Sequence, residues 1–201
     1  MMEKRQNGKA EDSSDISQKP QEQFNLKKEI LSWVETIIVA MVLVALIITF
    51  VGRMMRVEGS SMVPTLQNGE RIITTPLYKE LKHNDIVVIR RKDDKPLVKR
   101  IIGLPGDKIN INFDTHEVFV NDKVVDEPFI NEPTTRQYDV TFPATVPEGC
   151  YFVMGDNRNY SDDSRDSQIG MIDGRNIFGK AVFAVWPPEC FGKIEDQDYT
   201  Y

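Results

Sequence analysis

The sequence predicts a mainly β fold, in which an antiparallel β domain is tethered by one N-terminal transmembrane helix. Residues 31–51 form an unbroken apolar run whose only charge is Glu35. Residues 52–201 instead carry their apolar residues in short alternating runs, which are typical of half-buried strands. Residues 1–30 differ from both, because six basic and six acidic side chains leave few apolar residues there. We therefore expect three parts: a tail, a membrane anchor and one folded domain.

The first part, residues 1–30, has too little apolar surface to offset the conformational entropy lost on folding, which predicts a disordered tail. The run over residues 31–51 makes a helix of about 31 Å, enough to cross the hydrocarbon core. A cleavable secretory signal is the alternative, but it has a shorter apolar core followed by small residues. This run ends in Phe50 and Val51, which favours an uncleaved anchor. Lysines before it balance arginines after it, so charge leaves the topology open.

The domain over residues 52–201 has strand patterns along most of its length. Asn121-Asp122 is a two-residue hairpin signal, and Leu104-Pro105-Gly106-Asp107 suits a type II turn. A strand over residues 53–57 would place Met54 and Met55 near the bilayer surface, where we expect contacts with lipid. The other predicted strands cover residues 85–90, 97–102, 108–113, 117–120, 123–125, 150–154 and 178–186.

Composition excludes several functions. The chain has 25 basic and 31 acidic side chains and a net charge of −6, so no nucleic-acid partner is expected. Cys150 and Cys190 lack metal-site spacing and are expected as buried, unreactive thiols, although a disulfide between them stays open. His83 and His116 lie outside any triad or metal motif and are expected at the surface. No metal or other cofactor is predicted, so an enzyme of this sequence needs another way to activate its nucleophile.

The first segment that suggests chemistry is Glu58-Gly-Ser-Ser-Met-Val-Pro-Thr65, close behind the apolar run. Gly59 permits a sharp turn, Pro64 fixes the chain after it, and Ser61 is the hydroxyl best placed to project from that turn. The alternative is an ordinary loop that links the anchor to the domain.

The second segment places a lysine inside a predicted strand. Strand alternation puts Leu97, Lys99 and Ile101 on one face, so Lys99 lies between two apolar neighbours. Burial lowers a lysine pKa, by up to about 3–5 units when it is complete. Such a lysine can act as a general base for a serine hydroxyl. The alternative is that Lys99 extends to solvent from the strand edge.

The third segment, residues 154–165, is a dense run of short polar residues. It fails the EF-hand template, because Arg158 stands at the second ligand position and Ser161 stands where the loop needs glycine. A plain solvated loop is the other alternative, and it does not explain so many side chains able to fix their neighbours by hydrogen bonds.

Together these segments resemble the bacterial type I signal peptidases, in the short form with a single anchor. The resemblance covers nearly everything from residue 31 onward and rests on three motifs in family order. The motifs are Ser61-Met62-x-Pro64-Thr65, Lys99-Arg100-x-x-Gly103-x-Pro105-Gly106-Asp107 and Gly155-Asp156-Asn157-Arg158-x-x-Ser161-x-Asp163-Ser164-Arg165.

This resemblance implies a membrane-bound serine endopeptidase with a Ser/Lys dyad. Ser61 would be the nucleophile and Lys99 the general base, Ser161 would orient the lysine amine, and Asp163 and Arg165 would pair to hold that loop. The substrates implied are signal peptides of exported preproteins, cut after small residues at Ala-x-Ala sites. The family places the tail in the cytoplasm and residues 52–201, as the catalytic domain, on the outer face. The phospholipid bilayer and nearby secretion machinery are the other partners.

The sequence leaves open the second oxyanion donor and offers two alternative functions. The Ser61 backbone N–H is the expected oxyanion donor, but some family members add a serine two residues earlier, where this chain has Gly59. A backbone group or Ser60 could be the second donor.

Self-cleaving repressors with a Ser/Lys dyad are disfavoured by the apolar run and the acidic balance. A membrane-anchored binding or scaffolding protein with a non-functional peptidase site is disfavoured because Ser61 and Lys99 are both present.

Overall fold

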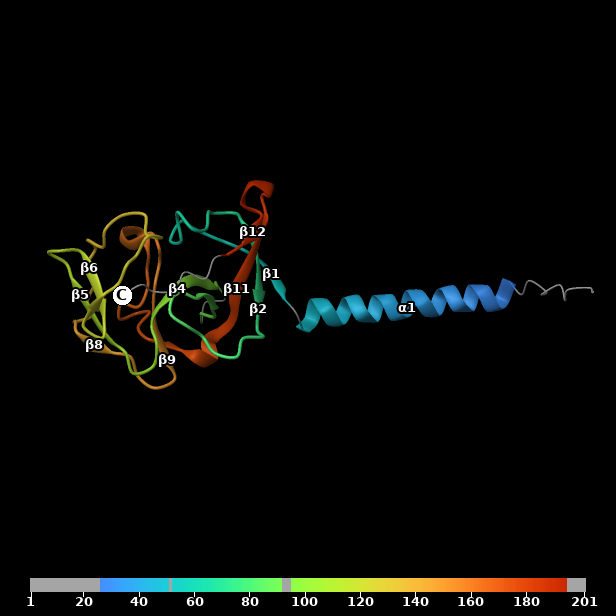
Figure 1. The fold of residues 1–201 in the computed structure, drawn as a ribbon, viewed down its shortest axis with the longest axis horizontal. Helices are drawn as coiled ribbons and strands as arrows, with labels where there is room; N and C mark the ends of the chain where they lie inside the picture. The colour runs from blue at the N-terminus through green and yellow to red at the C-terminus, as the bar shows by residue number, and fades with distance from the viewer. Residues whose placement is uncertain (1–25, 51, 92–94, 195–201) are drawn as a thin grey trace, which may run out of the picture. The chain divides into compact units, whose positions relative to one another are not determined.

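The computed structural model describes residues 26–50, 52–91 and 95–194, and it confirms the mainly antiparallel β fold with one N-terminal apolar helix (Figure 1). Residues 1–25, most of the predicted disordered tail, lie outside the described residues, as does Val51 at the end of the predicted anchor.

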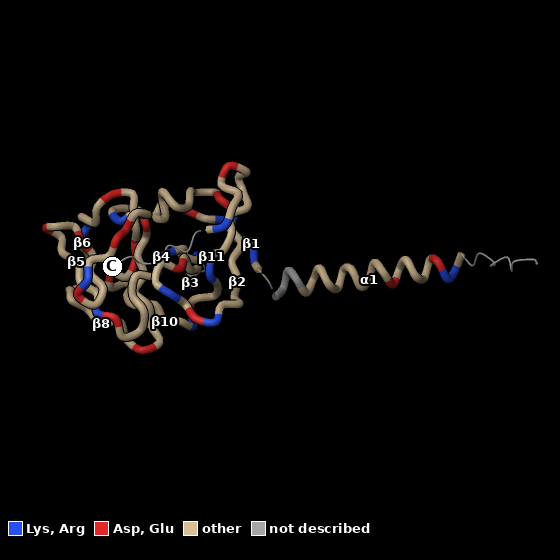
Figure 2. The backbone as a smooth tube through the Cα atoms, in the orientation of Figure 1, with Lys and Arg blue, Asp and Glu red and all other residues tan. Residues whose placement is uncertain are grey.

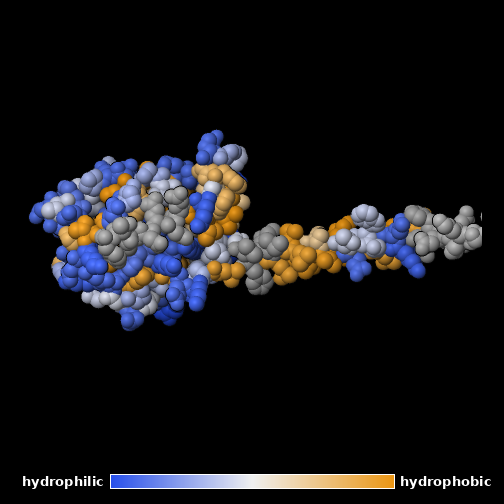
Figure 3. Space-filling model, viewed as in Figure 1, coloured by the Kyte–Doolittle hydropathy of each residue, from blue (hydrophilic) through white to orange (hydrophobic). Residues whose placement is uncertain are grey.

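Helix α1 (Leu26–Phe50) begins five residues before the apolar run, because Leu26, Lys27 and Lys28 join its first turn with Glu29. Glu29 is well placed there, since a negative charge stabilises the N-terminal end of the helix dipole. The stretch Leu26–Leu46 is long and apolar enough to cross a membrane, with a mean hydropathy of 2.1. Its side chains are exposed, and Figure 3 shows hydrophobic residues along the helix.

The larger sheet runs in the order β1-β2-β11-β3-β4-β9-β10, with β12 paired to β11, and every neighbouring pair is antiparallel. Its strands are β1 (Arg53–Arg56), β2 (Arg71–Thr75), β3 (Ile86–Ile89), β4 (Leu97–Gly103), β9 (Cys150–Met154), β10 (Ile172–Asp173), β11 (Ile177–Trp186) and β12 (Gly192–Lys193). Short 3-10 turns follow or precede them: η1 (Arg158–Tyr160), η2 (Gly174–Asn176) and η3 (Pro188–Cys190).

The smaller sheet has the order β7-β6-β5-β8 and is also antiparallel. Its strands are β5 (Lys108–Asn112), β6 (Glu117–Val120), β7 (Lys123–Val124) and β8 (Ala144–Thr145). The predicted hairpin is confirmed, because Asn121 and Asp122 have φ of 52° and 65°, as a type I′ turn requires. The predicted type II turn is confirmed too, with Gly106 at φ 88° and an Asp107 N–H to Leu104 carbonyl bond of 3.0 Å.

Strand β4 is the centre of the core. It contributes Val98 to a cluster with Met62 and Leu66 next to the larger sheet's first strands. Ile101 belongs to a second cluster with residues of β3 and β9, and Ile102 to a third beneath the smaller sheet. Strand β4 is buried almost throughout, so its polar side chains, Lys99 included, lie inside the domain.

Both cysteines and both histidines are half-buried in the domain. Cys150 and Cys190 are free thiols that pack against different apolar clusters, so no disulfide joins them, and both are half-buried. His83 and His116 are half-buried, which differs from the surface positions expected. A polar contact explains the position of His83, because its Nε2 lies 2.7 Å from Asp107 Oδ2 at the turn before β5.

Candidate active site

Ser61 lies in a loop between β1 and β2 that is closed at its base by backbone hydrogen bonds. The Val57 N–H donates to the Glu70 carbonyl and the Gly69 N–H to the Val57 carbonyl, both at 2.8 Å. Gly59 has φ 86°, a conformation that favours glycine, and its N–H donates to Asn68 Oδ1 at 3.0 Å. The loop therefore has a fixed shape that leaves the Ser61 side chain half-exposed.

Lys99 lies beside this loop. Its Nζ is 2.7 Å from Ser61 Oγ, and its side chain is almost wholly buried, with 2% of the residue exposed. The solvent-exposed alternative is therefore wrong. Burial lowers the pKa of Lys99 to about 8, against the opposing pull of Asp163, Asp162 and Asp156. The lysine amine can thus be neutral just above physiological pH, in contact with a hydroxyl.

The polar segment after β9 holds the serine loop from the other side. The Asn157 N–H donates to the Ser61 carbonyl at 3.0 Å, and Asn157 Nδ2 donates to the Ser60 carbonyl at the same distance. Gly155 packs so closely that a side chain there would overlap the Ser61 carbonyl oxygen and the Ser161 side chain. Its N–H donates to Asp163 Oδ2 at 3.0 Å. Three polar segments far apart in sequence thus meet around one hydroxyl.

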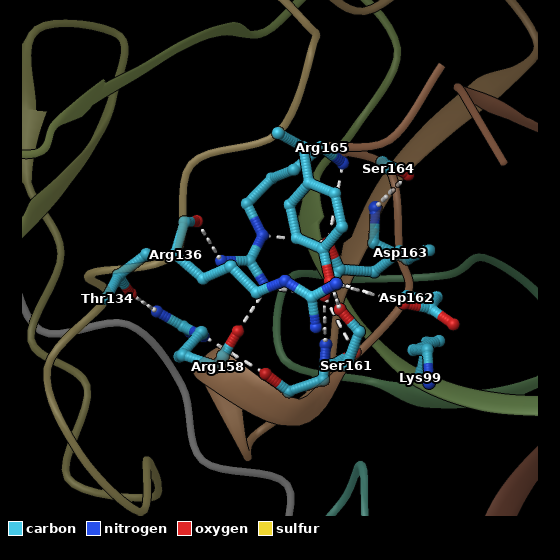
Figure 4. A network of polar contacts seen from close by, with 12 residues as sticks. Lys99, Thr134, Arg136, Arg158, Ser161, Asp162, Asp163, Ser164 and Arg165 are labelled. Atoms are coloured by element: carbon cyan, nitrogen blue, oxygen red, sulfur yellow. Dashed lines mark hydrogen bonds and ion pairs between the residues drawn. The ribbon is translucent and has the colours of Figure 1, made fainter. Parts of the chain in front are cut away.

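A buried network stabilises the polar segment (Figure 4). Arg165 makes a two-point contact with Asp163, from Nε to Oδ1 at 2.8 Å and from Nη2 to Oδ2 at 2.9 Å. Burial alone would raise the pKa of Asp163, but the hydrogen bonds and charge of Arg165 outweigh it and lower that pKa. The predicted ion pair between these two residues is present.

Ser161 differs from its predicted contact. Its hydroxyl donates to Asp163 Oδ2 at 2.8 Å, and the hydrogen bonds of the described residues include none from Ser161 to the Lys99 amine. The physical reason is that a hydroxyl has one proton, and an ionised carboxylate is a stronger acceptor than a neutral group. The bond to Asp163 fixes the Ser161 oxygen and leaves its lone pairs for another donor.

Comparison with known proteins identifies the family of this sequence. Residues 30–186 match the family model described as signal peptidase, peptidase S26. The chain belongs to this signal peptidase family. It is 41% identical over 186 residues to Signal peptidase I of Bacillus licheniformis, covering 87% of this chain and 96% of that one. It is 40% identical over 177 residues to Signal peptidase I S of Bacillus subtilis, covering 83% and 94%. A solved signal peptidase I from Enterococcus faecalis is 31% identical, covers 51% of this chain and 97% of that one, and gives a TM-score of 0.43.

In this member of the signal peptidase family, a second buried ion pair supports the serine loop. Arg100 contacts Asp156 from Nε to Oδ1 at 2.8 Å and from Nη2 to Oδ2 at 2.6 Å, and both side chains are buried. Thr65, on the serine loop, donates its hydroxyl to the same carboxylate at 2.5 Å. The Arg100 guanidinium also lies 4.0 Å from the centre of the Phe129 ring. Sequence analysis assigned these residues no role, although Thr65, Arg100 and Asp156 lie in the quoted motifs.

A third pair, between Arg158 and Glu127, was also missed. Arg158 Nη2 lies 2.6 Å from Glu127 Oε1, and its Nη1 donates to Glu127 Oε2 at 2.7 Å. Glu127 lies in the long connection between β7 and β8 of the smaller sheet and belongs to none of the motifs. Among the described residues, no group of three or more His, Cys, Asp and Glu side chains is placed to hold a metal ion.

Breaking the Asp163–Arg165 pair should cost much more stability than breaking a surface pair. We expect Arg165→Met to lower the free energy of unfolding by about 3–5 kcal/mol, because it leaves Asp163 buried without its counter-charge. Arg175→Met is the matched control, since Arg175 contacts Asp173 at the surface, where water screens an ion pair and its contribution to stability is small. Chemical denaturation of both variants in detergent measures the difference, and equal losses would contradict the role assigned to the buried pair.

Proposed function

We propose that this chain is a membrane-anchored serine endopeptidase that cleaves signal peptides from exported preproteins with a dyad of Ser61 and Lys99. One observation carries the proposal: Lys99 Nζ lies 2.7 Å from Ser61 Oγ in a buried setting that lowers the lysine pKa to about 8. The relatives named Signal peptidase I support the same activity, and their names specify the substrate class.

The chemistry follows from these two groups. Neutral Lys99 takes the proton of the Ser61 hydroxyl as Oγ attacks the scissile carbonyl, and the resulting ammonium gives a proton to the leaving amine. Water then hydrolyses the acyl-enzyme with Lys99 again as the base. Ser161, fixed by Asp163, offers a lone pair to the lysine ammonium during this cycle. Asp163 and Arg165 are positioning residues, because they act through Ser161 and the segment around it.

The oxyanion needs two donors. Among the hydrogen bonds of the described residues, none uses the N–H of Ser60 or of Ser61, whereas the Gly59 N–H is engaged by Asn68. Successive backbone N–H groups in a turn can converge on an anion, and Ser60 and Ser61 directly follow Gly59 with its φ of 86°. We therefore assign the two donors to the backbone N–H groups of Ser60 and Ser61, which needs no side chain at Gly59.

Strand β1, which follows the proposed membrane anchor in the chain, is the proposed binding site for the substrate. β1 is the last strand in its sheet order, so it offers a free edge to an extended peptide. Helix α1 is the proposed anchor, with residues 1–30 in the cytoplasm and residues 52–201 on the outer face. We propose that shallow apolar surface beside β1 accepts only the small residues of Ala-x-Ala sites. The partners proposed are preprotein signal peptides, the phospholipid bilayer and nearby secretion machinery.

The direct test uses full-length protein in detergent and a precursor with an Ala-x-Ala site. We expect release of the mature protein, with its new N-terminus located by mass spectrometry after the second alanine. A precursor with leucine in place of that alanine should resist cleavage. If neither precursor is cut by well-folded protein, the alternative of an anchored binding or scaffolding protein gains support.

The depressed pKa of Lys99 predicts how activity depends on pH. Its ammonium form, which cannot accept a proton, is lost as pH rises through about 8. We expect kcat/KM to rise about tenfold per pH unit below that value and to level off above it. Rates from pH 6 to 9.5 on a substrate without nearby titratable groups measure the profile. A rate that stays constant from pH 6 to 8 would mean that another group is the base.

A further inference from the structure

Three arginines line a cavity of about 220 Å³ at one end of the larger sheet. We call it the arginine pocket and define it by Arg53, Arg90 and Arg91, together with Pro96 and Phe178. The proposed peptidase chemistry uses none of these side chains. Its lining combines three arginines with a proline and a phenylalanine, residue types suited to an anionic group on an apolar body.

The strand register explains why these residues meet. Arg53 at the start of β1 pairs with Thr74, and the next residue of β2, Thr75, pairs with Lys180 near the start of β11. Ile89 at the end of β3 pairs both with Ile177 and with Leu97 at the start of β4. The ends of five strands, β1, β2, β11, β3 and β4, therefore lie side by side at one end of the sheet. That end is where Arg53, Arg90, Pro96 and Phe178 are found.

The same end is where the chain arrives from α1. Arg53 follows Phe50, the last helical residue, by three positions, so the two are at most about 10 Å apart. The headgroup layer adds roughly 5–8 Å to each side of the hydrocarbon core. If α1 spans the membrane, as the proposed function states, the arginine pocket must lie at or next to the lipid phosphates. Leu77, which is 66% exposed two residues after β2, adds apolar surface near this end.

Charge supports an anionic occupant. Residues 52–201 carry 19 basic and 24 acidic side chains, so a pocket with three arginines opposes the average of the domain. Figure 2 shows a basic stretch, in blue, on β1. No ion pair among the described residues involves Arg53 or Arg90. Guanidinium groups bind phosphate oxygens through paired, charge-assisted hydrogen bonds.

We propose that the arginine pocket binds the phosphodiester of an anionic phospholipid in the leaflet that faces the domain. Arg53 and Arg90 hold the phosphate oxygens, and the lipid's glycerol and chains lie toward Phe178, Leu77 and the bilayer. The bound lipid keeps β1, the free edge offered to the substrate, at the membrane surface where a signal peptide emerges. This inference rests on the proposed anchoring by α1 and does not depend on the peptidase chemistry.

The test measures lipid binding without substrate. Full-length protein in a non-ionic detergent is titrated with dihexanoyl phosphatidylglycerol, and bound lipid is counted by native mass spectrometry. We expect Arg53→Gln combined with Arg90→Gln to weaken binding by about tenfold or more, because two charge-assisted contacts are lost. Lys108→Gln combined with Lys123→Gln is the matched control, since it removes two exposed charges from the smaller sheet and should leave affinity within about twofold. Dihexanoyl phosphatidylcholine should bind more weakly to the wild type.

Three outcomes would overturn the proposal. Equal lipid binding by the arginine variant and the wild type would exclude the pocket. Displacement of the lipid by an equal concentration of inorganic phosphate would make it a site for free phosphate. If the arginine variant bound lipid as the wild type does but had a higher KM for a precursor in lipid-free detergent, the pocket would be assigned to the substrate. Failure of the enzyme to cleave any precursor would leave the binding result intact, so the two proposals fail separately.

Discussion

Ser61→Ala and Lys99→Met are each expected to reduce kcat for an Ala-x-Ala precursor by at least about 1,000-fold. The serine variant removes the proposed nucleophile. The lysine variant removes the amine that lies 2.7 Å from Ser61 Oγ, while methionine keeps a similar length and volume. Because two groups that act as a unit are not additive, the double variant should be about as inactive as either single one. Initial rates with full-length enzyme in detergent measure the effect.

The controls separate chemistry from folding. Lys99→Met should unfold at or above the wild-type temperature, because it removes an ammonium that burial disfavours. Lys95→Met is the matched control, since Lys95 is an exposed lysine just before the same strand, and its kcat should stay within about twofold of the wild type. Retention of more than a tenth of wild-type kcat by folded Lys99→Met would remove Lys99 from the role of general base.

Local patterns predicted much of this fold. The hairpin at Asn121 and Asp122 and the turn at Gly106 need particular backbone angles, so residue type alone indicates them. The burial of Lys99 was one of two alternatives, because alternation fixes which neighbours share a strand face but not whether that face is covered. In the structure β4 is buried almost throughout. Ser61 and Lys99 could be matched to roles only through the family resemblance. Nothing in the spacing of 38 residues between them predicts that they touch.

The remaining features depend on contacts between distant segments. Arg100 and Asp156 lie 56 residues apart, and Arg158 reaches Glu127 across 31 residues, so no periodicity reveals either pair. The proton of Ser161 goes to Asp163 because that carboxylate is held, ionised and buried, beside it by Arg165, which is a property of the folded network. Strand β2 was not predicted, and its place is fixed by pairing on both sides, with β1 and β11.

The second large effect is expected at Gly155, which has no side chain with which to react. A methyl group there would overlap the Ser61 carbonyl oxygen and the Oγ and Cβ atoms of Ser161. The carbonyl belongs to the backbone and cannot rotate away alone, so Gly155→Ala must shift the serine loop and break its 3.0 Å contact with the Asn157 N–H. A displacement of about 1 Å at a reacting group costs on the order of 100-fold in rate, and we expect a loss of at least that size in kcat.

Comparison with a second glycine shows whether this loss comes from displacement of Ser61. At Gly192 an added Cβ meets nothing within 4 Å, so Gly192→Ala should leave kcat, KM and the unfolding temperature near their wild-type values. Overpacking in Gly155→Ala should itself cost about 1–3 kcal/mol of stability, so rates are to be compared at a temperature where both variants are fully folded. If kcat of folded Gly155→Ala then equals that of Gly192→Ala, the serine loop tolerates the shift. The close packing of Gly155 against Ser61 would in that case be unnecessary for the proposed attack.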